Sequence, residues 1–271
     1  MEAGAVGARV AVNGVEIAYW RRGEGIPVLC IHETASAAAV WRPLAAVPEE
    51  GLCAIAYDRR GWGASTAPDP YLRTTIEEQA EDAAALLERL GSGPAILCGA
   101  GLGAVVALDL ILRRPALVRG ALLIEPPLLA LLPEATEGIS ADAARIESAV
   151  AAEGPAAAID LFLRGELSSL GAGAERLPPE IGAVARRSPL SLFAELGAVP
   201  GWSMSSAELA AAARPTRVAV SSSTPPLLRR AAEELAGRLG GSALVEVGGS
   251  GLPHLGAATE LVPTLAGLGR A

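Results

Sequence analysis

Length, composition and charge set the first limits on what the chain can do. It has 271 residues, of which 51% are hydrophobic and 19% are charged. That is enough apolar material for one large domain with a sizeable core, and it argues against disorder. The net charge of −8 argues against a nucleic-acid partner, because binding to phosphates needs clustered cations.

The N-terminal 126 residues alternate between strand and helix patterns. A hairpin is expected around Asn13-Gly14, because this dipeptide favours the tight turn that joins two strands. Short apolar runs then predict buried parallel strands at 27–31, 52–57, 94–98 and 120–124, and two more follow at 216–220 and 243–247. Helices are expected near 75–90, 102–114, 226–239 and 255–268. The pattern predicts an α/β fold with a mostly parallel sheet and an N-terminal hairpin.

The segment 127–212 differs from the rest, because it is rich in alanine and has no strand-like run. Gly and Pro interrupt it at 154–155, 171–173, 178–179 and 200–201. We interpret it as four short helices forming a cap, with 1–126 and 213–271 as the core. Insertions of this kind commonly cover a pocket at the carboxyl ends of the strands.

Four segments carry a family resemblance, and they are I-H-E-T-A-S-A-A-A-V-W (31–41), Y-D-R-R-G-W-G-A-S (57–65), G-A-G-L-G (99–103) and V-G-G-S-G-L-P-H (247–254). They resemble the oxyanion loop, the turn after the fourth strand, the G-x-S-x-G nucleophile elbow and the histidine loop of α/β-hydrolases. The resemblance implies the α/β-hydrolase fold with a helical cap. Gly101 stands where the family carries its nucleophile, and glycine has no oxygen with which to attack.

The resemblance also implies roles for other residues. His254 would be the catalytic base, and the backbone amides of Thr34 and Leu102 would form the oxyanion hole. Glu125 follows the strand that ends at 124 and would orient His254. The alternatives for this side chain are to cap the N-terminus of a helix or to form a salt bridge to the segment 127–212. His32 is expected to hold the oxyanion loop. Expected substrate contacts are Glu33, Trp41, Phe162, Phe193 and Trp202, although the aromatic residues of the cap could equally form its own core.

A dinucleotide site is the main alternative for the glycine-rich turn. G-A-G-L-G-A also fits G-x-G-x-x-A after a strand and before a helix, which would indicate NAD(P) or FAD. That fingerprint usually follows the first strand of its domain, and it leaves the H-E-T and terminal histidine segments unexplained. We therefore expect no cofactor. With only two histidines and no Cys/His cluster, we expect no metal site either.

Three classes of function remain open. The first is a non-hydrolytic enzyme that uses a His–Glu acid–base pair and an oxyanion hole for C–C bond formation, conjugate addition or cyclisation. The second is a hydrolase or C–C lyase in which water attacks, and the third is a binding protein that has lost catalysis. A Ser→Gly knockout made in the laboratory is a further possibility, but alanine is the usual choice and the altered H-E loop indicates natural divergence.

The first class is preferred, because relatives of this fold that have lost the serine act on polyketide-type aromatics in bacterial secondary metabolism. All 22 basic residues are arginine, which is typical of a GC-rich genome. The expected partner is an apolar, anthraquinone-like small molecule. We expect no membrane association, a cytoplasmic location with reduced cysteines, and a monomer or homodimer.

Overall fold

The computed structural model describes residues 6–47, 49, 51–170, 176–212, 214–248 and 252–270. It contains one eight-stranded sheet in the order β1-β2-β4-β3-β5-β6-β7-β8. The first two strands form an antiparallel hairpin, β2 pairs antiparallel with β4, and the remaining pairs are parallel. The strands are β1 (Val6–Val12), β2 (Val15–Gly23), β3 (Ile26–Ile31), β4 (Leu52–Tyr57), β5 (Ala95–Ala100), β6 (Val118–Ile124), β7 (Thr216–Ser221) and β8 (Ser242–Val247). The predicted fold class is confirmed.

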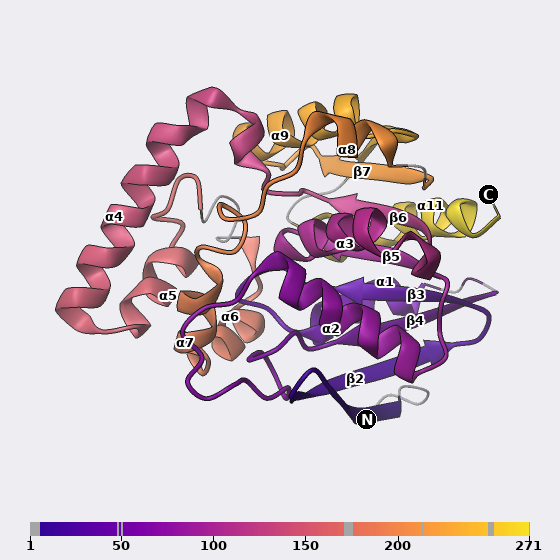
Figure 1. The fold of residues 1–271 in the computed structure, drawn as a ribbon, viewed down its shortest axis with the longest axis horizontal. Coiled ribbons are helices and arrows are strands. Elements are labelled where there is room, and N and C mark those ends of the chain that lie inside the picture. The colour runs from indigo at the N-terminus through magenta and orange to yellow at the C-terminus, as the bar shows by residue number, and fades with distance from the viewer. Residues whose placement is uncertain are drawn as a thin grey trace.

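The strands alternate their side chains between two apolar cores, one on each face of the sheet. In β3, Leu29 and Ile31 belong to one core, while Val28 and Cys30 belong to the other. The first core is covered by α2 (Ile76–Arg89), α3 (Leu102–Arg113) and α9 (Pro226–Arg238), and the second by α1 (Arg42–Ala46) and α11 (Ala258–Arg270). Figure 1 shows α2 and α3 in front of the sheet. Short helices η1 (Ala38–Trp41), η2 (Pro115–Leu117) and α10 (Pro253–Gly256) complete this part.

Where the structure describes it, the expected cap region consists of helices joined by turns and loops and contains no strand. It contains η3 (Leu129–Leu131), η4 (Pro133–Ala135), α4 (Thr136–Glu153), α5 (Ala156–Leu163), α6 (Pro179–Arg186), α7 (Pro189–Glu195) and α8 (Ser206–Ala211). Gly154, at φ +87°, ends α4, and Pro179 begins α6, as the breaks predicted. The break at 171–173 lies outside the described residues.

Two details of the predicted cap are wrong. The expectation of four short helices fails because α4 alone has 18 residues, and five α-helices occur in the described part of 127–212. Helices α4 to α7 gather at the left of Figure 1, whereas α8 lies beside α9. Leu209 of α8 is buried in the main core, so this helix packs with the core rather than with α4 to α7.

The three cysteines are all buried in strands. Cys30, Cys53 and Cys98 are unpaired and fully inaccessible to solvent, as expected from their positions in apolar runs. The apolar stretch 94–112 forms β5 and α3 rather than one long helix. Among the described residues, no helix combines the length and the hydropathy that a membrane crossing requires.

Candidate active site

The turn between β5 and α3 forces glycine at three alternate positions. A Cβ on Gly99 would lie 2.3 Å from the carbonyl oxygen of Gly103, and a Cβ on Gly103 would lie 2.2 Å from that of Ile31. Gly101 has φ +52° and ψ −125°, a backbone conformation that side-chain-bearing residues rarely adopt. The close packing of β5, α3 and the end of β3 therefore explains these glycines without a bound dinucleotide.

Glu33 fills the space in which a side chain at position 101 would begin. An ideal Cβ built on Gly101 would lie only 2.8 Å from the Cβ of Glu33, and real Cβ atoms essentially never come so close. The two residues are therefore matched to each other, which supports natural divergence at Gly101. Glu33 comes shortly after the buried end of β3 in the sequence, and its side chain is only 12% exposed.

His254 lies next to the Glu33 carboxylate. Its Nε2 is 3.3 Å from Oε2 of Glu33, within ion-pair distance, although the two groups are not aligned for a hydrogen bond. Trp41 packs on the imidazole, with ring centroids 4.8 Å apart and a tilt of 37°. Nδ1 of His254 has no hydrogen-bond partner among the described residues.

The charge of Glu33 depends on this neighbour. Burial works to raise the pKa of the Glu33 carboxyl, but the adjacent His254, with a smaller contribution from His32, acts in the other direction, and the net pKa is about 2. Glu33 is thus ionised at neutral pH. The structure places the Glu33 side chain in the pocket next to Gly101, where a substrate contact was expected.

Glu125 does not contact His254 as the sequence analysis expected. Its carboxylate accepts two hydrogen bonds from Arg176 of the cap region, at 2.9 and 2.7 Å, and another from the hydroxyl of Thr224. Glu125 itself has φ +46°, which is a strained backbone for a residue with a Cβ. Glu125 pairs with Arg176 and not with His254 because a bidentate guanidinium is the stronger partner for a buried carboxylate. The alternative of a salt bridge to the cap describes this residue.

His32 holds the oxyanion loop, as expected. Its Nδ1 donates to the carbonyl of Glu33 at 2.7 Å, while its Nε2 accepts from the amide of Arg59 at 3.0 Å, which fixes the neutral tautomer. Burial, with a contribution from Arg59, lowers the pKa of His32 to about 3.

Arg59 ties this loop to the cap region. Its guanidinium donates to the carbonyls of His32 and Glu33 at 3.0 and 3.1 Å. It also pairs with the carboxylate of Glu195 in α7, and Trp62 donates to the same carboxylate at 2.7 Å. Arg59 and Glu195 are both almost fully buried. The backbone that presents Glu33 is therefore anchored to α7 by a buried ion pair.

The two expected oxyanion-hole donors lie at the mouth of the same site. The backbone amides of Thr34 and Leu102 donate to no backbone acceptor in the part of the chain that the structure describes. Leu102 is the first residue of α3, where the helix dipole adds to the attraction for negative charge. Both residues line the cavities next to Gly101.

Two neighbouring cavities form the site. The inner cavity, of about 80 Å³, is lined by the charged residues Glu33, Glu125, Arg176 and His254 together with Gly101. The outer cavity, of about 330 Å³, is mostly apolar and lies between the core and the cap helices. Thr34, Leu102, Pro127, Phe162 and Leu170 line both, so the two cavities lie side by side.

The five expected substrate contacts have different outcomes. Glu33 and Phe162 line the cavities, but Trp41, Phe193 and Trp202 do not. Trp41 is fully buried behind His254. Phe193 is 38% exposed on the surface of α7, and Trp202 packs into the main core with its indole donating to Asp109 at 2.8 Å. These three expectations are corrected.

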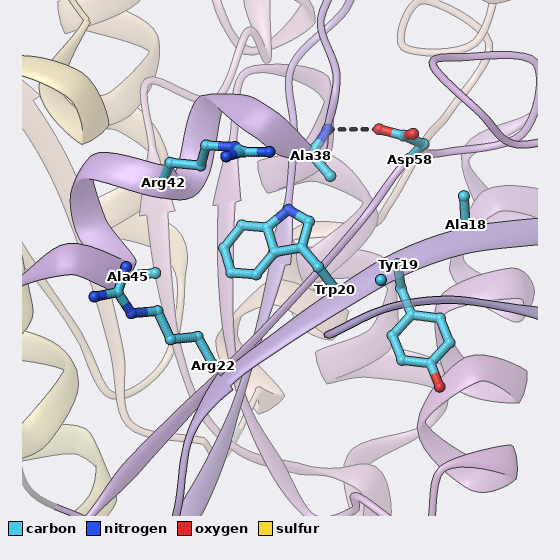
Figure 2. A pocket seen from close by; sticks show the side chains of 9 residues that line it. Ala18, Tyr19, Trp20, Arg22, Ala38, Arg42, Ala45 and Asp58 are labelled. Atoms are coloured by element: carbon cyan, nitrogen blue, oxygen red, sulfur yellow. Dashed lines mark hydrogen bonds between the residues drawn. The ribbon is translucent and has the colours of Figure 1, made fainter. Parts of the chain in front are cut away.

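A separate hollow of about 210 Å³ lies beside β2 and α1 (Figure 2). Arg22 and Arg42 flank the Trp20 indole there, and Asp58 accepts a hydrogen bond of 2.7 Å from the amide of Ala38. Neither Gly101 nor any residue of the inner cavity lines this hollow. Within the described residues, no group of three His, Cys, Asp or Glu is placed to hold a metal ion. The site is therefore assigned to the cavities at Gly101.

Sequence reasoning missed Arg59, Arg176 and Glu195. Arg59 belongs to the D-R-R-G-W-G segment, so its place next to the oxyanion loop could have been inferred from that turn. Arg176 and Glu195 come from the cap region, and no local pattern marks them.

Comparison with known proteins decides the family. Residues 28–264 match the family model described as "Alpha/beta hydrolase family". The chain belongs to this family. An uncharacterised hydrolase, YraK of Bacillus subtilis, is 33% identical over 121 residues, which is 45% of each chain. A 2-(acetamidomethylene)succinate hydrolase of Mesorhizobium japonicum is 29% identical over 178 residues, covering 65% of this chain and 62% of that protein. These alignments span only about half of the relatives' lengths.

Solved structures agree on the fold. A hydrolase from Pseudomonas aeruginosa has a TM-score of 0.77 at 22% identity, with 98% of both chains covered. An enol-lactonase from Burkholderia xenovorans has a TM-score of 0.72 at 20% identity, with 97% of this chain and 100% of that chain covered. At such identities the likeness concerns the fold.

Proposed function

We propose that this member of the alpha/beta hydrolase family is an enzyme that works without a covalent nucleophile on the elbow. The observation that carries the proposal is the pairing of Gly101 with Glu33. Position 101 has no side chain, and the Cβ of Glu33 takes the space in which one would begin. A route through an acyl-enzyme at this position is therefore closed.

The remaining groups suit proton transfer. The His254–Glu33 pair can move a proton to or from carbon or oxygen, since an imidazole and a carboxylate are common general acids and bases. The free amides of Thr34 and Leu102 can stabilise an enolate or phenolate oxygen. The mostly apolar outer cavity of about 330 Å³ falls within the size range of small-molecule sites and suits an apolar substrate.

These properties together favour C–C bond formation, either by conjugate addition or by cyclisation. The proposed substrate is an apolar, polyketide-type molecule related to anthraquinones, and the proposed setting is bacterial secondary metabolism. Deprotonation generates the carbon nucleophile, the amides hold the developing oxyanion, and the cavity keeps the intermediate away from water. The substrate class rests on resemblance to relatives of the fold that act on such molecules.

Hydrolysis by an activated water is the second candidate. The curated relatives favour it, because they include a 2-(acetamidomethylene)succinate hydrolase and an epoxide hydrolase of Caballeronia sordidicola that is 35% identical over 108 residues. The His254–Glu33 pair could serve as the base for such a water.

Turnover in ¹⁸O-labelled water separates the two candidates. Candidate polyketide intermediates are incubated with the protein in this solvent, and the products are analysed by mass spectrometry. In a cyclisation or a conjugate addition, the chemical step adds no oxygen atom from the solvent, so the product gains no ¹⁸O in that step. Incorporation of ¹⁸O in that step would contradict the proposal and establish hydrolysis. His254→Ala serves as the control for background reaction.

A further inference from the structure

Glu33 is more accessible from the cavity than His254. Both line the inner cavity, yet the side chain of Glu33 is 12% exposed and that of His254 only 1%. Trp41 covers the imidazole by ring packing, and Glu33 lies next to its Nε2. In the enzymes that this site resembles, Nε2 would face the nucleophile. Here the carboxylate occupies that side, so the imidazole is enclosed behind it.

The oxygens of Glu33 lack hydrogen-bond donors. Neither Oε1 nor Oε2 accepts a hydrogen bond within the described residues, although the residue is about nine-tenths buried. An ionised carboxylate is an acceptor only, and leaving one buried without donors is unfavourable. The neighbouring carboxylate differs in this respect, because Glu125 is saturated by Arg176 and Thr224. The missing donors for Glu33 are therefore expected to come from a ligand in the inner cavity.

We propose that Glu33, rather than His254, is the catalytic residue that meets the substrate, and that it selects neutral apolar molecules carrying a phenol or enol hydroxyl. This inference rests on the proposed function and names the substrate group on which it begins. The substrate hydroxyl donates a hydrogen bond to a carboxylate oxygen of Glu33, which stays ionised. The amides of Thr34 and Leu102 stabilise that oxygen. His254 is then a positioning residue that acts through Glu33.

The charge of the inner cavity supports a neutral substrate. Arg176 is neutralised by Glu125 at 2.7 Å, so it offers little attraction to an added anion. The carboxylate of Glu33 would repel an anionic group placed against it. The inner cavity, of about 80 Å³, has room for a small polar group, while the apolar body of the substrate would occupy the outer cavity.

Binding of three naphthalene probes tests the inference by isothermal titration calorimetry at pH 7. 2-Naphthol carries the hydroxyl hydrogen, 2-methoxynaphthalene lacks it, and 2-naphthoate is an anion of similar size. The native protein is expected to bind 2-naphthol at least about 10-fold more tightly than 2-methoxynaphthalene, as for a hydrogen bond to a charged acceptor. It should bind 2-naphthoate at least about 10-fold more weakly than 2-naphthol, and this comparison needs no variant.

Variants identify the residue responsible. Glu33→Gln keeps the shape but removes the charge, and it should reduce the preference for 2-naphthol to about 3-fold or less. His254→Gln should keep most of the preference. Glu233→Gln, on the exposed face of α9, is the matched control that should leave it unchanged.

Two results would overturn the assignment of Glu33. One is a native protein with no preference for 2-naphthol or with tighter binding of 2-naphthoate. The other is a preference that survives Glu33→Gln but disappears in His254→Gln, which would make the imidazole the contact. Failure of the proposed reaction is a separate outcome, since it would appear as ¹⁸O in the product while the binding preference remains.

Discussion

Gly101→Ser restores the side chain that the elbow lacks, and the structure predicts that this change destabilises the fold. Serine at φ +52° costs about 1–3 kcal/mol in backbone strain. Its Cβ would lie 2.8 Å from the Cβ of Glu33, and overpacking of this kind adds about 1–3 kcal/mol. We expect the free energy of unfolding to fall by about 2–6 kcal/mol, which corresponds to a decrease in Tm of roughly 4–24 °C.

A second substitution, made at Glu33, separates the cost of the Cβ–Cβ clash from the cost of the backbone strain at position 101. Because the clashing atom is the Cβ, Glu33→Gly removes it and Glu33→Ala keeps it. In a double-mutant cycle measured by urea unfolding, Glu33→Gly should recover about 1–3 kcal/mol of the loss caused by Gly101→Ser, and Glu33→Ala less than about 0.5 kcal/mol. A Gly101→Ser protein as stable as the native protein would contradict the predicted clash, as would a rescue by Glu33→Ala as large as that by Glu33→Gly.

His254→Ala is expected to lower turnover of the true substrate by up to about 10²-fold, because it removes the group that positions Glu33, and a rate within about threefold of the native rate would leave the imidazole without a part in catalysis. Glu195→Gln should lower the free energy of unfolding by about 3–5 kcal/mol, because it leaves the Arg59 guanidinium buried without its counter-charge, and a loss below about 1 kcal/mol in urea would contradict this. Burial and Arg59 lower the pKa of His32 from 6.5 to about 3, so the fold keeps it neutral while the unfolded chain binds a proton. The free energy of unfolding that this pKa difference contributes is complete above pH 6.5. It is lost as the pH falls toward 3, and the total loss is on the order of 5 kcal/mol. Urea unfolding between pH 7.5 and 4 should show about 3 kcal/mol of this loss. His32→Gln should reduce the loss, and a profile equal for the two proteins would contradict it.

The parallel sheet could be predicted because its signals are local. Each buried strand is a short apolar run, and the turn at Asn13-Gly14 has positive φ at both residues, as the hairpin pattern requires. The glycines at 99, 101 and 103 were recognisable for the same reason, since the close approach of strand and helix leaves no room for side chains at 99 and 103. These features depend on neighbours in sequence or on one packing contact.

The partners of the charged residues could not be predicted in this way. Glu125 lies at the edge of the site, as expected for a residue directly after a strand. Its partner Arg176, however, comes 51 residues later, from a segment without a motif. The orientation of Glu33 depends on the absence of a side chain at Gly101, a contact between two loops. Phe193 and Trp202 have the same apolar character as cavity residues, and only tertiary packing separates surface, core and pocket.

The most direct test of the central claim is intact-mass analysis after treatment with a fluorophosphonate that captures activated serines. The native protein should keep its mass, because Gly101 carries no nucleophile and Glu33 occupies the space of one. The Gly101→Ser/Glu33→Gly protein provides the comparison, because it has both the serine and the room for it, and it should gain one adduct located on the 99–103 turn. A stoichiometric adduct on the native protein would show that another serine serves as the nucleophile, and it would contradict an enzyme that works without one.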